Sequence, residues 1–153
     1  MQNWKNSPRR KPLIIRGARQ TGKTWLMKEF GKTSFNETIY INCENEPTLK
    51  NLFTQDYDVQ RILSTIQLYH GKKITPDDTL IIFDEIQAVE GGITSLKYFN
   101  ENAPQYAIVA AGSLLGISLH ENQSFPVGKV SFLDLHPLSF SEFLIASGKE
   151  MLC

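Results

Sequence analysis

The chain has 153 residues, a formal net charge of zero, 41% hydrophobic residues and 21% charged residues. This length allows one domain with a substantial core, and the balanced charge gives no overall attraction to nucleic acid or to an anionic membrane, although a local basic patch is not excluded. The two cysteines lack the spacing of a disulfide framework and no apolar run approaches the roughly 20 residues of a membrane span, so we expect a reduced, cytoplasmic protein without membrane partners.

Strand-like and helix-like segments alternate along the chain. In order, we predict strands at residues 13–16, 38–43, 79–83, 106–111 and within 127–135, with helices at 24–30, over 48–69 with a break near 55–57, at 94–102 and from 139 onward. Gly31 is the predicted stop of the first helix, and Ser139 or Ser141 the cap of the last. Strands joined by helical crossovers indicate a mostly parallel sheet. Because several strands are hydrophobic throughout, we expect an α/β three-layer fold of about five strands, covered on both faces.

The ends of the chain suggest a domain plan. Residues 1–10 are polar and basic without an apolar signal region, so we expect a short lead-in, with one domain over 11–153. Apolar residues continue to the last position, Cys153, shortly after a helical pattern. We therefore expect the sequence to stop before a further C-terminal domain.

One loop matches the pattern G-x-x-x-x-G-K-[ST] and lies between a predicted strand and a predicted helix. Its residues are Gly17, Ala18, Arg19, Gln20, Thr21, Gly22, Lys23 and Thr24. Such a loop binds phosphates because its N–H groups and the helix N-terminus point at the ligand. Lys23 would place its charge between the β- and γ-phosphates, and Thr24 would ligate Mg²⁺. The alternative is a glycine-rich turn with an exposed lysine; the loop favours a nucleoside triphosphate, expected to be ATP with Mg²⁺.

Two acidic residues follow the apolar run that ends at Phe83. Ligands of open α/β sheets bind at the carboxyl ends of strands, so Asp84 should lie beside the phosphate loop and hold the metal. Glu85 is the candidate base that polarises the attacking water. Without the loop, the same pair would indicate only a strand ending at a solvated turn.

A third strand end carries Ser113, which follows Gly112. Its side chain could contact the γ-phosphate or the attacking water, and a simple Gly-Ser turn is the alternative. Further cations that could stabilise charge on the phosphoryl group are Arg16, Arg19 and Lys129, although a solvated role is the stronger expectation for Lys129.

The segments RGARQTGKTWLMKEFG, TIYINCE, LIIFDEIQ, AAGSLLG and VGKVSFLDLHPLSFSEFL occur in this order. Together they resemble the AAA_14-type ATPases of bacteria and archaea, over about residues 10–144. The resemblance implies that residues 17–24 are Walker A, that Asp84 and Glu85 are Walker B, and that Ser113 is a sensor-like residue. It implies ATP rather than GTP, and an additional strand between the Lys23 strand and the Asp84 strand. Lys129 stands where the family often has arginine, which puts an arginine-like role there in doubt.

The leading hypothesis is therefore a Mg²⁺-dependent ATPase that couples hydrolysis to a conformational change. A small-molecule kinase would use the same loop, but we see no arginine-rich lid between residues 112 and 129. The other alternative is a nucleotide-binding switch or an inactive fragment. The resemblance also implies a longer chain with a C-terminal effector domain and a homo-oligomer in which a neighbour completes the site. A role with nucleic acid rests on family analogy alone.

Overall fold

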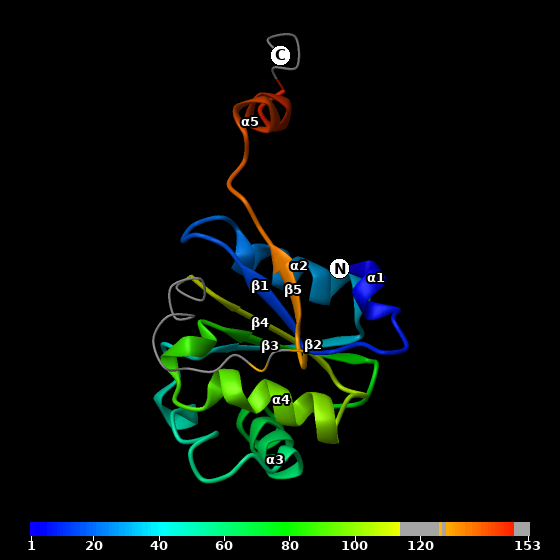
Figure 1. Cartoon of the computed structure of the whole chain (residues 1–153), viewed down its shortest axis with the longest axis vertical. Coiled ribbons are helices and arrows are strands. Elements are labelled where there is room, and N and C mark those ends of the chain that lie inside the picture. Colours follow the sequence, from blue (N-terminus) through cyan, green and yellow to red (C-terminus); the bar gives the residue numbers. More distant parts are fainter. Residues whose placement is uncertain (114–125, 127, 149–153) are drawn as a thin grey trace.

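The computed structural model describes residues 1–113, 126 and 128–148, and it has a five-stranded parallel sheet at its centre (Figure 1). The strands are β1 (Leu13–Arg16), β2 (Glu37–Asn42), β3 (Thr79–Asp84), β4 (Ala107–Gly112) and β5 (Ser131–Asp134), in the spatial order β2-β3-β4-β1-β5. Strand β4 thus lies between β1 and β3, which confirms the expected additional strand. The register pairs Arg16 with Gly112 and Asp84 with Ala111, so the carboxyl ends of β1, β3 and β4 lie at one level of the sheet.

Helices cover both faces of the sheet, as the hydrophobic strands predict. They are α1 (Gln2–Lys5), α2 (Lys23–Ser34), α3 (Val59–His70), α4 (Gly92–Asn102) and α5 (Phe140–Ala146), with short 3-10 turns η1 (Pro47–Leu49) and η2 (Ile86–Ala88). In Figure 1, α3 and α4 lie on one face, and α2 lies with α1 on the other. None of the helices in the described residues has the length and apolar character needed to cross a bilayer.

Successive side chains of the central strands enter two separate cores. On β3, Ile81 and Phe83 pack with the buried residues of α3 and α4, whereas Leu80 and Ile82 pack with those of α2. All six residues of β3 and of β4 are buried. Burial on both faces explains why these strands have no polar alternation.

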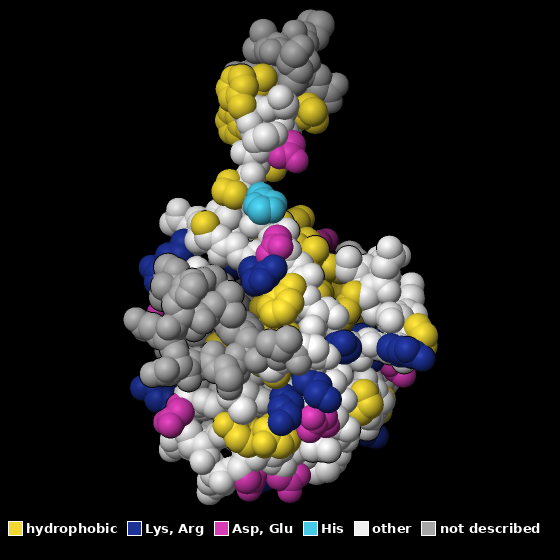
Figure 2. Space-filling model, in the orientation of Figure 1, with side chains coloured by type: hydrophobic (Ala, Val, Ile, Leu, Met, Phe, Trp, Pro, Cys, Tyr) yellow, Lys and Arg dark blue, Asp and Glu magenta, His cyan; other side chains and the backbone are white. Residues whose placement is uncertain are grey.

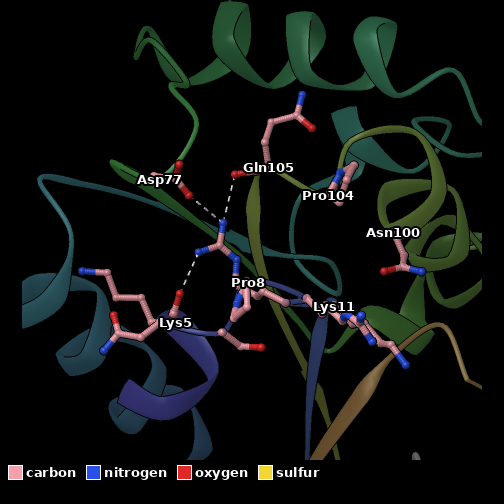
Figure 3. A pocket seen from close by; sticks show the side chains of 11 residues that line it. Lys5, Pro8, Lys11, Asp77, Asn100, Pro104 and Gln105 are labelled. Atoms are coloured by element: carbon pink, nitrogen blue, oxygen red, sulfur yellow. Dashed lines mark hydrogen bonds and ion pairs between the residues drawn. The ribbon is translucent and has the colours of Figure 1, made fainter.

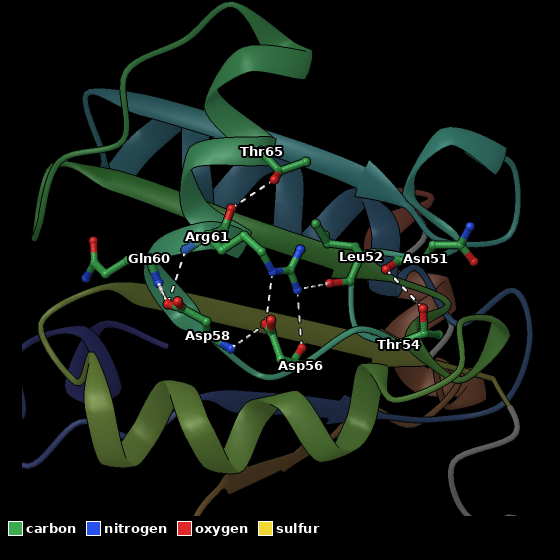
Figure 4. A network of polar contacts seen from close by, with 8 residues as sticks. All are labelled: Asn51, Leu52, Thr54, Asp56, Asp58, Gln60, Arg61 and Thr65. Carbon is green, nitrogen blue, oxygen red and sulfur yellow. Dashed lines mark hydrogen bonds and ion pairs between the residues drawn. The ribbon is translucent and has the colours of Figure 1, made fainter.

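The turn before α3 is held by hydrogen bonds around one arginine (Figure 4). The Asp58 carboxylate caps α3 by accepting from the N–H groups of Gln60 and Arg61. The Arg61 guanidinium donates to the Asp56 carboxylate at 2.9 Å and to the carbonyl oxygen of Leu52 at 2.7 Å. These contacts account for the predicted break near residues 55–57.

Helix α5 projects away from the sheet and its covering helices (Figure 1). Ser139, one of the two expected caps, begins α5 with a capping box, because its hydroxyl accepts from the N–H of Glu142 and its own N–H donates to the Glu142 carboxylate. Figure 2 shows hydrophobic side chains on this projecting part. The large exposed ones there are Leu138, Phe140, Phe143 and Ile145.

Two local predictions were wrong. Helix α2 continues through Gly31 to Ser34, and the first part of the expected helix over 48–69 forms only the 3-10 turn η1. The segment expected as a lead-in contains the short helix α1. Gly31 is needed for close approach and not as a stop. A β-carbon there would lie 3.1 Å from the Cβ of Thr38 and 2.7 Å from its Cγ2, so α2 can rest on β2 only where it has no side chain.

The substitution Gly31→Ala tests this contact. Helix propensity alone predicts a gain of about 1 kcal/mol, whereas overpacking a tight contact costs about 1–3 kcal/mol. We expect a net loss of about 1 kcal/mol in the free energy of unfolding, measured by urea titration. In a Thr38→Ala background the same substitution should become neutral or stabilising. A gain in stability with Thr38 in place would contradict the proposed packing.

Candidate functional site

A cleft of about 700 Å³ opens at the carboxyl ends of the central strands. It is lined by Arg19, Gln20, Gly22, Lys23, Thr24, Trp25, Lys28, Glu44 and Glu85. These residues come from the β1–α2 loop, the first turns of α2, and the segments that follow β2 and β3. The cleft therefore lies where a parallel α/β sheet binds ligands, and several of the residues expected from the sequence face it.

The backbone of the β1–α2 loop has the turns that such a loop needs. Gln20 and Gly22 have positive φ angles of 60° and 87°, and Gly22 is the N-cap of α2. A β-carbon at Gly17 would lie 2.5 Å from the carbonyl oxygen of Leu135, so only glycine lets the loop pass beside the end of β5. The helix thus begins with free N–H groups that face the cleft, a site suited to an anion.

The Lys23 side chain is enclosed by its own loop. It is 6% exposed, and its ammonium donates to the carbonyl oxygens of Gly17 at 3.0 Å and of Ala18 at 2.5 Å. Thr21 lies beside it, with its hydroxyl oxygen 3.4 Å from the Lys23 Nζ. This arrangement differs from a turn with an exposed lysine, because a cation is held inside the loop at the floor of the cleft.

The Asp84 carboxylate lies at the end of β3 beside the first turn of α2. It is 3% exposed, and its Oδ2 accepts from the Thr24 hydroxyl at 2.5 Å and from the Tyr40 hydroxyl at 2.7 Å. Its Oδ1 accepts from the N–H of Glu85 at 3.0 Å. A hydroxyl and a carboxylate at this separation form the hard oxygen donor set that suits Mg²⁺, which needs only one or two protein ligands.

The Glu85 backbone is left-handed, with a φ of 51°, which turns its side chain toward β4. Its Oε2 accepts from the Gln87 side chain at 2.6 Å, from the Ser113 hydroxyl at 3.3 Å and from the Ser113 N–H at 3.4 Å. The structure thus brings together Glu85 and Ser113, which are 28 residues apart. A non-glycine residue in this conformation is strained, and such strain is frequent at functional positions.

Two of the three cations suggested by the sequence have other partners. Arg16 pairs with the Asp134 carboxylate through two hydrogen bonds of 2.7 and 3.0 Å, and this contact holds the pKa of Asp134 below its usual value. Lys129 pairs with Glu101 at 3.3 Å. Arg19 lines the cleft. The Lys129 side chain is 42% exposed, so the ion pair is a solvated one.

Sequence reasoning missed Tyr40. It lies on β2, paired in register with Ile82 of β3, and burial followed by its hydrogen bond to Asp84 raises its pKa, so the phenol stays protonated and donates. A weak signal was available, because Tyr40 is the polar-tipped residue between Ile39 and Ile41.

Cys43, at the end of the same segment, is buried, and that burial, with nearby carboxylates, raises the pKa of its thiol to about 12. The thiol is therefore a packing group.

Trp25 and Gln87 were also missed as parts of this site. Trp25 fits the helical spacing of a core residue but is 68% exposed and lines the cleft. Gln87 lies in η2 and reaches Glu85 only because the chain turns sharply after β3. Neither position follows from periodicity, since both depend on how the turns place the side chains.

A second cavity, of about 660 Å³, lies at the amino ends of the strands (Figure 3). Arg10 is a buried cation there, with a side chain 8% exposed that donates to the Asp77 carboxylate and to the carbonyl oxygens of Lys5 and Gln105. These contacts attach the N-terminal segment to the edge of the sheet that is opposite to the phosphate loop. They give Arg10 a structural role.

Known structures share this fold. The Walker-type ATPase PABY2304 of Pyrococcus abyssi matches with a TM-score of 0.58 and 18% identity, over 99% of this chain and 57% of that one. Drosophila ORC bound to AT-rich DNA and Cdc6 matches with a TM-score of 0.51 and 13% identity, over 85% and 51%. C. elegans PCH-2 matches at 0.46 and 16%, over 96% and 40%. The chain thus spans 40–57% of the length of these structures, and at such identities the first two show the fold alone.

A search of curated proteins gives no match. The family model AAA_14, described as an AAA domain, matches residues 9–144. This range includes the phosphate loop, all five strands and most of α5, in agreement with the P-loop arrangement of the sheet. The chain therefore belongs to the AAA_14 family of AAA domains.

Proposed function

We propose that the chain binds ATP with Mg²⁺ in the cleft at the carboxyl ends of β1, β3 and β4, and hydrolyses it to drive a conformational change. The observation that supports this most strongly is the 2.5 Å contact between the Thr24 hydroxyl and the Asp84 carboxylate. It joins the end of the phosphate loop to the acidic end of β3. The chain's membership of the AAA_14 family and its P-loop fold both agree with this proposal.

The loop residues 17–24 would bind the phosphates through their backbone N–H groups and the N-terminus of α2. Lys23 already lies inside the loop, where carbonyl oxygens of Gly17 and Ala18 satisfy its ammonium. On binding, the ammonium would exchange these neutral acceptors for charged phosphate oxygens. Phosphate oxygens add a Coulombic attraction to the ammonium that neutral carbonyl oxygens lack, so the exchange favours the nucleotide.

Thr24 and Asp84 would hold Mg²⁺, which would neutralise charge on the phosphate oxygens when bound. Glu85 would polarise the attacking water, and Ser113 would orient it or contact the γ-phosphate. In the structure, Gln87 and Ser113 both donate to the same oxygen of Glu85, and within the described part of the chain this leaves its Oε1 for a water. A pair of donors on one oxygen fixes the direction of the other, as a positioned base requires.

We also propose that a neighbouring copy completes the site and that an effector domain in a longer chain receives the motion. Arg16 and Lys129 are paired with Asp134 and Glu101, and Arg19 is the one of the three candidate cations that lines the cleft, so a neighbour would add a further charge to stabilise phosphoryl transfer. The rate of ATP hydrolysis per chain should therefore rise with protein concentration, over the same range in which sedimentation shows the chains assembling. Full turnover of a monomer, independent of concentration, would contradict this.

Lys23→Ala tests the binding site. Loss of a charge-assisted contact to phosphate should weaken ATP binding about 100-fold, corresponding to about 3 kcal/mol, as measured by isothermal titration. Lys32→Ala is the matched control, because Lys32 is an exposed residue of the same helix. Equal affinities for the wild type and for Lys23→Ala would show that the nucleotide binds elsewhere.

Glu85→Gln tests hydrolysis. The amide cannot accept a proton, so phosphate release should fall at least about 100-fold while ATP affinity changes little. Glu90→Gln, at an exposed carboxylate that does not line the cleft, is the control and should hydrolyse ATP at the wild-type rate.

The same assay separates the alternatives. If the wild type and Glu85→Gln both bind ATP and neither hydrolyses it, the chain is a nucleotide-binding switch and the proposed hydrolysis is wrong. If phosphate transfer occurs only with an added small-molecule acceptor, the chain is a kinase.

A further inference from the structure

We propose that Tyr40 is a positioning residue for the metal-binding carboxylate, holding Asp84 in the orientation that receives Mg²⁺. This inference rests on the proposed function, because it concerns the same site. Tyr40 comes from β2, a strand that contributes neither to the phosphate loop nor to the acidic strand end. Its phenol lies 2.7 Å from the Asp84 Oδ2.

The argument begins with the donors around Asp84. Three groups donate to the carboxylate: the Glu85 N–H to Oδ1, and the hydroxyls of Thr24 and Tyr40 to Oδ2. A Thr24 oxygen that ligates Mg²⁺ does so through a lone pair, so its hydroxyl can still donate to Asp84. The donors that are not themselves metal ligands are Glu85 and Tyr40, one on each carboxylate oxygen. Together they fix the rotation of the carboxylate without using the metal.

Burial makes the contribution of Tyr40 hard to replace. Asp84 is 3% exposed, so solvent has little access to an oxygen that loses its donor. A buried acceptor left without its partner costs about 1–3 kcal/mol, more when it is charged. Without the phenol, Oδ2 would keep the Thr24 hydroxyl as its donor, and the rotation of the carboxylate would be held less firmly in the position that receives the metal.

Tyr40 is itself held firmly. Its backbone is paired to β3, with Tyr40 opposite Ile82, and its ring packs against the core between the sheet and α2. The ammonium of Lys28 on α2 lies 4.0 Å from the ring centroid on the cleft side. The phenol is thus held between β3 and α2, so little conformational freedom is lost when it donates to Asp84.

Tyr40→Phe removes the hydroxyl and keeps the ring, so packing and positioning can be separated. The affinity for a non-hydrolysable ATP analogue is measured by isothermal titration, once with excess Mg²⁺ and once with EDTA. The ratio of the two affinities reports the metal's contribution. We expect this ratio to fall about tenfold in Tyr40→Phe, while the affinity in EDTA stays within about twofold of the wild type.

Controls keep the outcome interpretable. Tyr69→Phe, a hydroxyl deletion on the exposed Tyr69 of α3, should leave both affinities unchanged. Thermal unfolding in EDTA shows that the variant is folded, and Tyr40→Met, which also lacks the hydroxyl but fills the space flexibly, provides a second test if Tyr40→Phe is unstable.

An unchanged ratio in a folded Tyr40 variant, with a clear Mg²⁺ effect in the wild type, would overturn the role of Tyr40 and leave the proposed function intact. A fall of the affinity in EDTA equal to the fall in Mg²⁺ would show a packing role and also overturn the inference. A wild type whose affinity does not respond to Mg²⁺ would overturn the metal site itself, and Tyr40's role with it.

Discussion

The contact between Thr24 and Asp84 joins two segments that are 60 residues apart in the sequence, and the rest of the site is arranged around it. It requires α2 to begin at the level where β3 ends. Parallel pairing through β4 sets that level, since Arg16 lies opposite Gly112 and Asp84 lies opposite Ala111. A shift of one residue in either pairing would move the two oxygens by about 3.3 Å and would turn the strand's side chains to the other face.

The insertion of β4 between β1 and β3 has a second consequence. It places the residue after β4, Ser113, between the phosphate loop and the acidic strand end, where it donates to Glu85. A sheet with β1 beside β3 would leave no strand end at that point. The interior strand has small side chains near its end, Ala110, Ala111 and Gly112, which let its neighbours approach while both faces remain buried.

The accuracy of the sequence predictions followed the range of the interactions involved. The strands at 13–16 and 79–83 were placed nearly to the residue, because each is a short apolar run that ends at a glycine or an acidic pair. The end of α2 was wrong because the need for Gly31 comes from Thr38 on another element. Tyr40 was missed for the same reason: its partner, Asp84, is 44 residues away, and only the β2–β3 pairing brings them together. Local motifs predicted the loop, whereas the support around it depends on tertiary contacts.

The residues around Asp84 also indicate which kind of ligand the cleft favours. Among the described residues, the ion pairs do not include Asp84, and its three donors are a threonine, a tyrosine and a backbone N–H. A charge that is 3% exposed with only neutral partners is costly for folding, because dipoles replace lost hydration incompletely. Lys23, the nearest cation along the loop, donates instead to carbonyl oxygens. A core carboxylate kept solely for stability would be expected to have a cation beside it. The arrangement supports the proposal of a cation that arrives with the ligand, in which Thr24 and Asp84 would supply oxygens and Tyr40 would keep one of them in place.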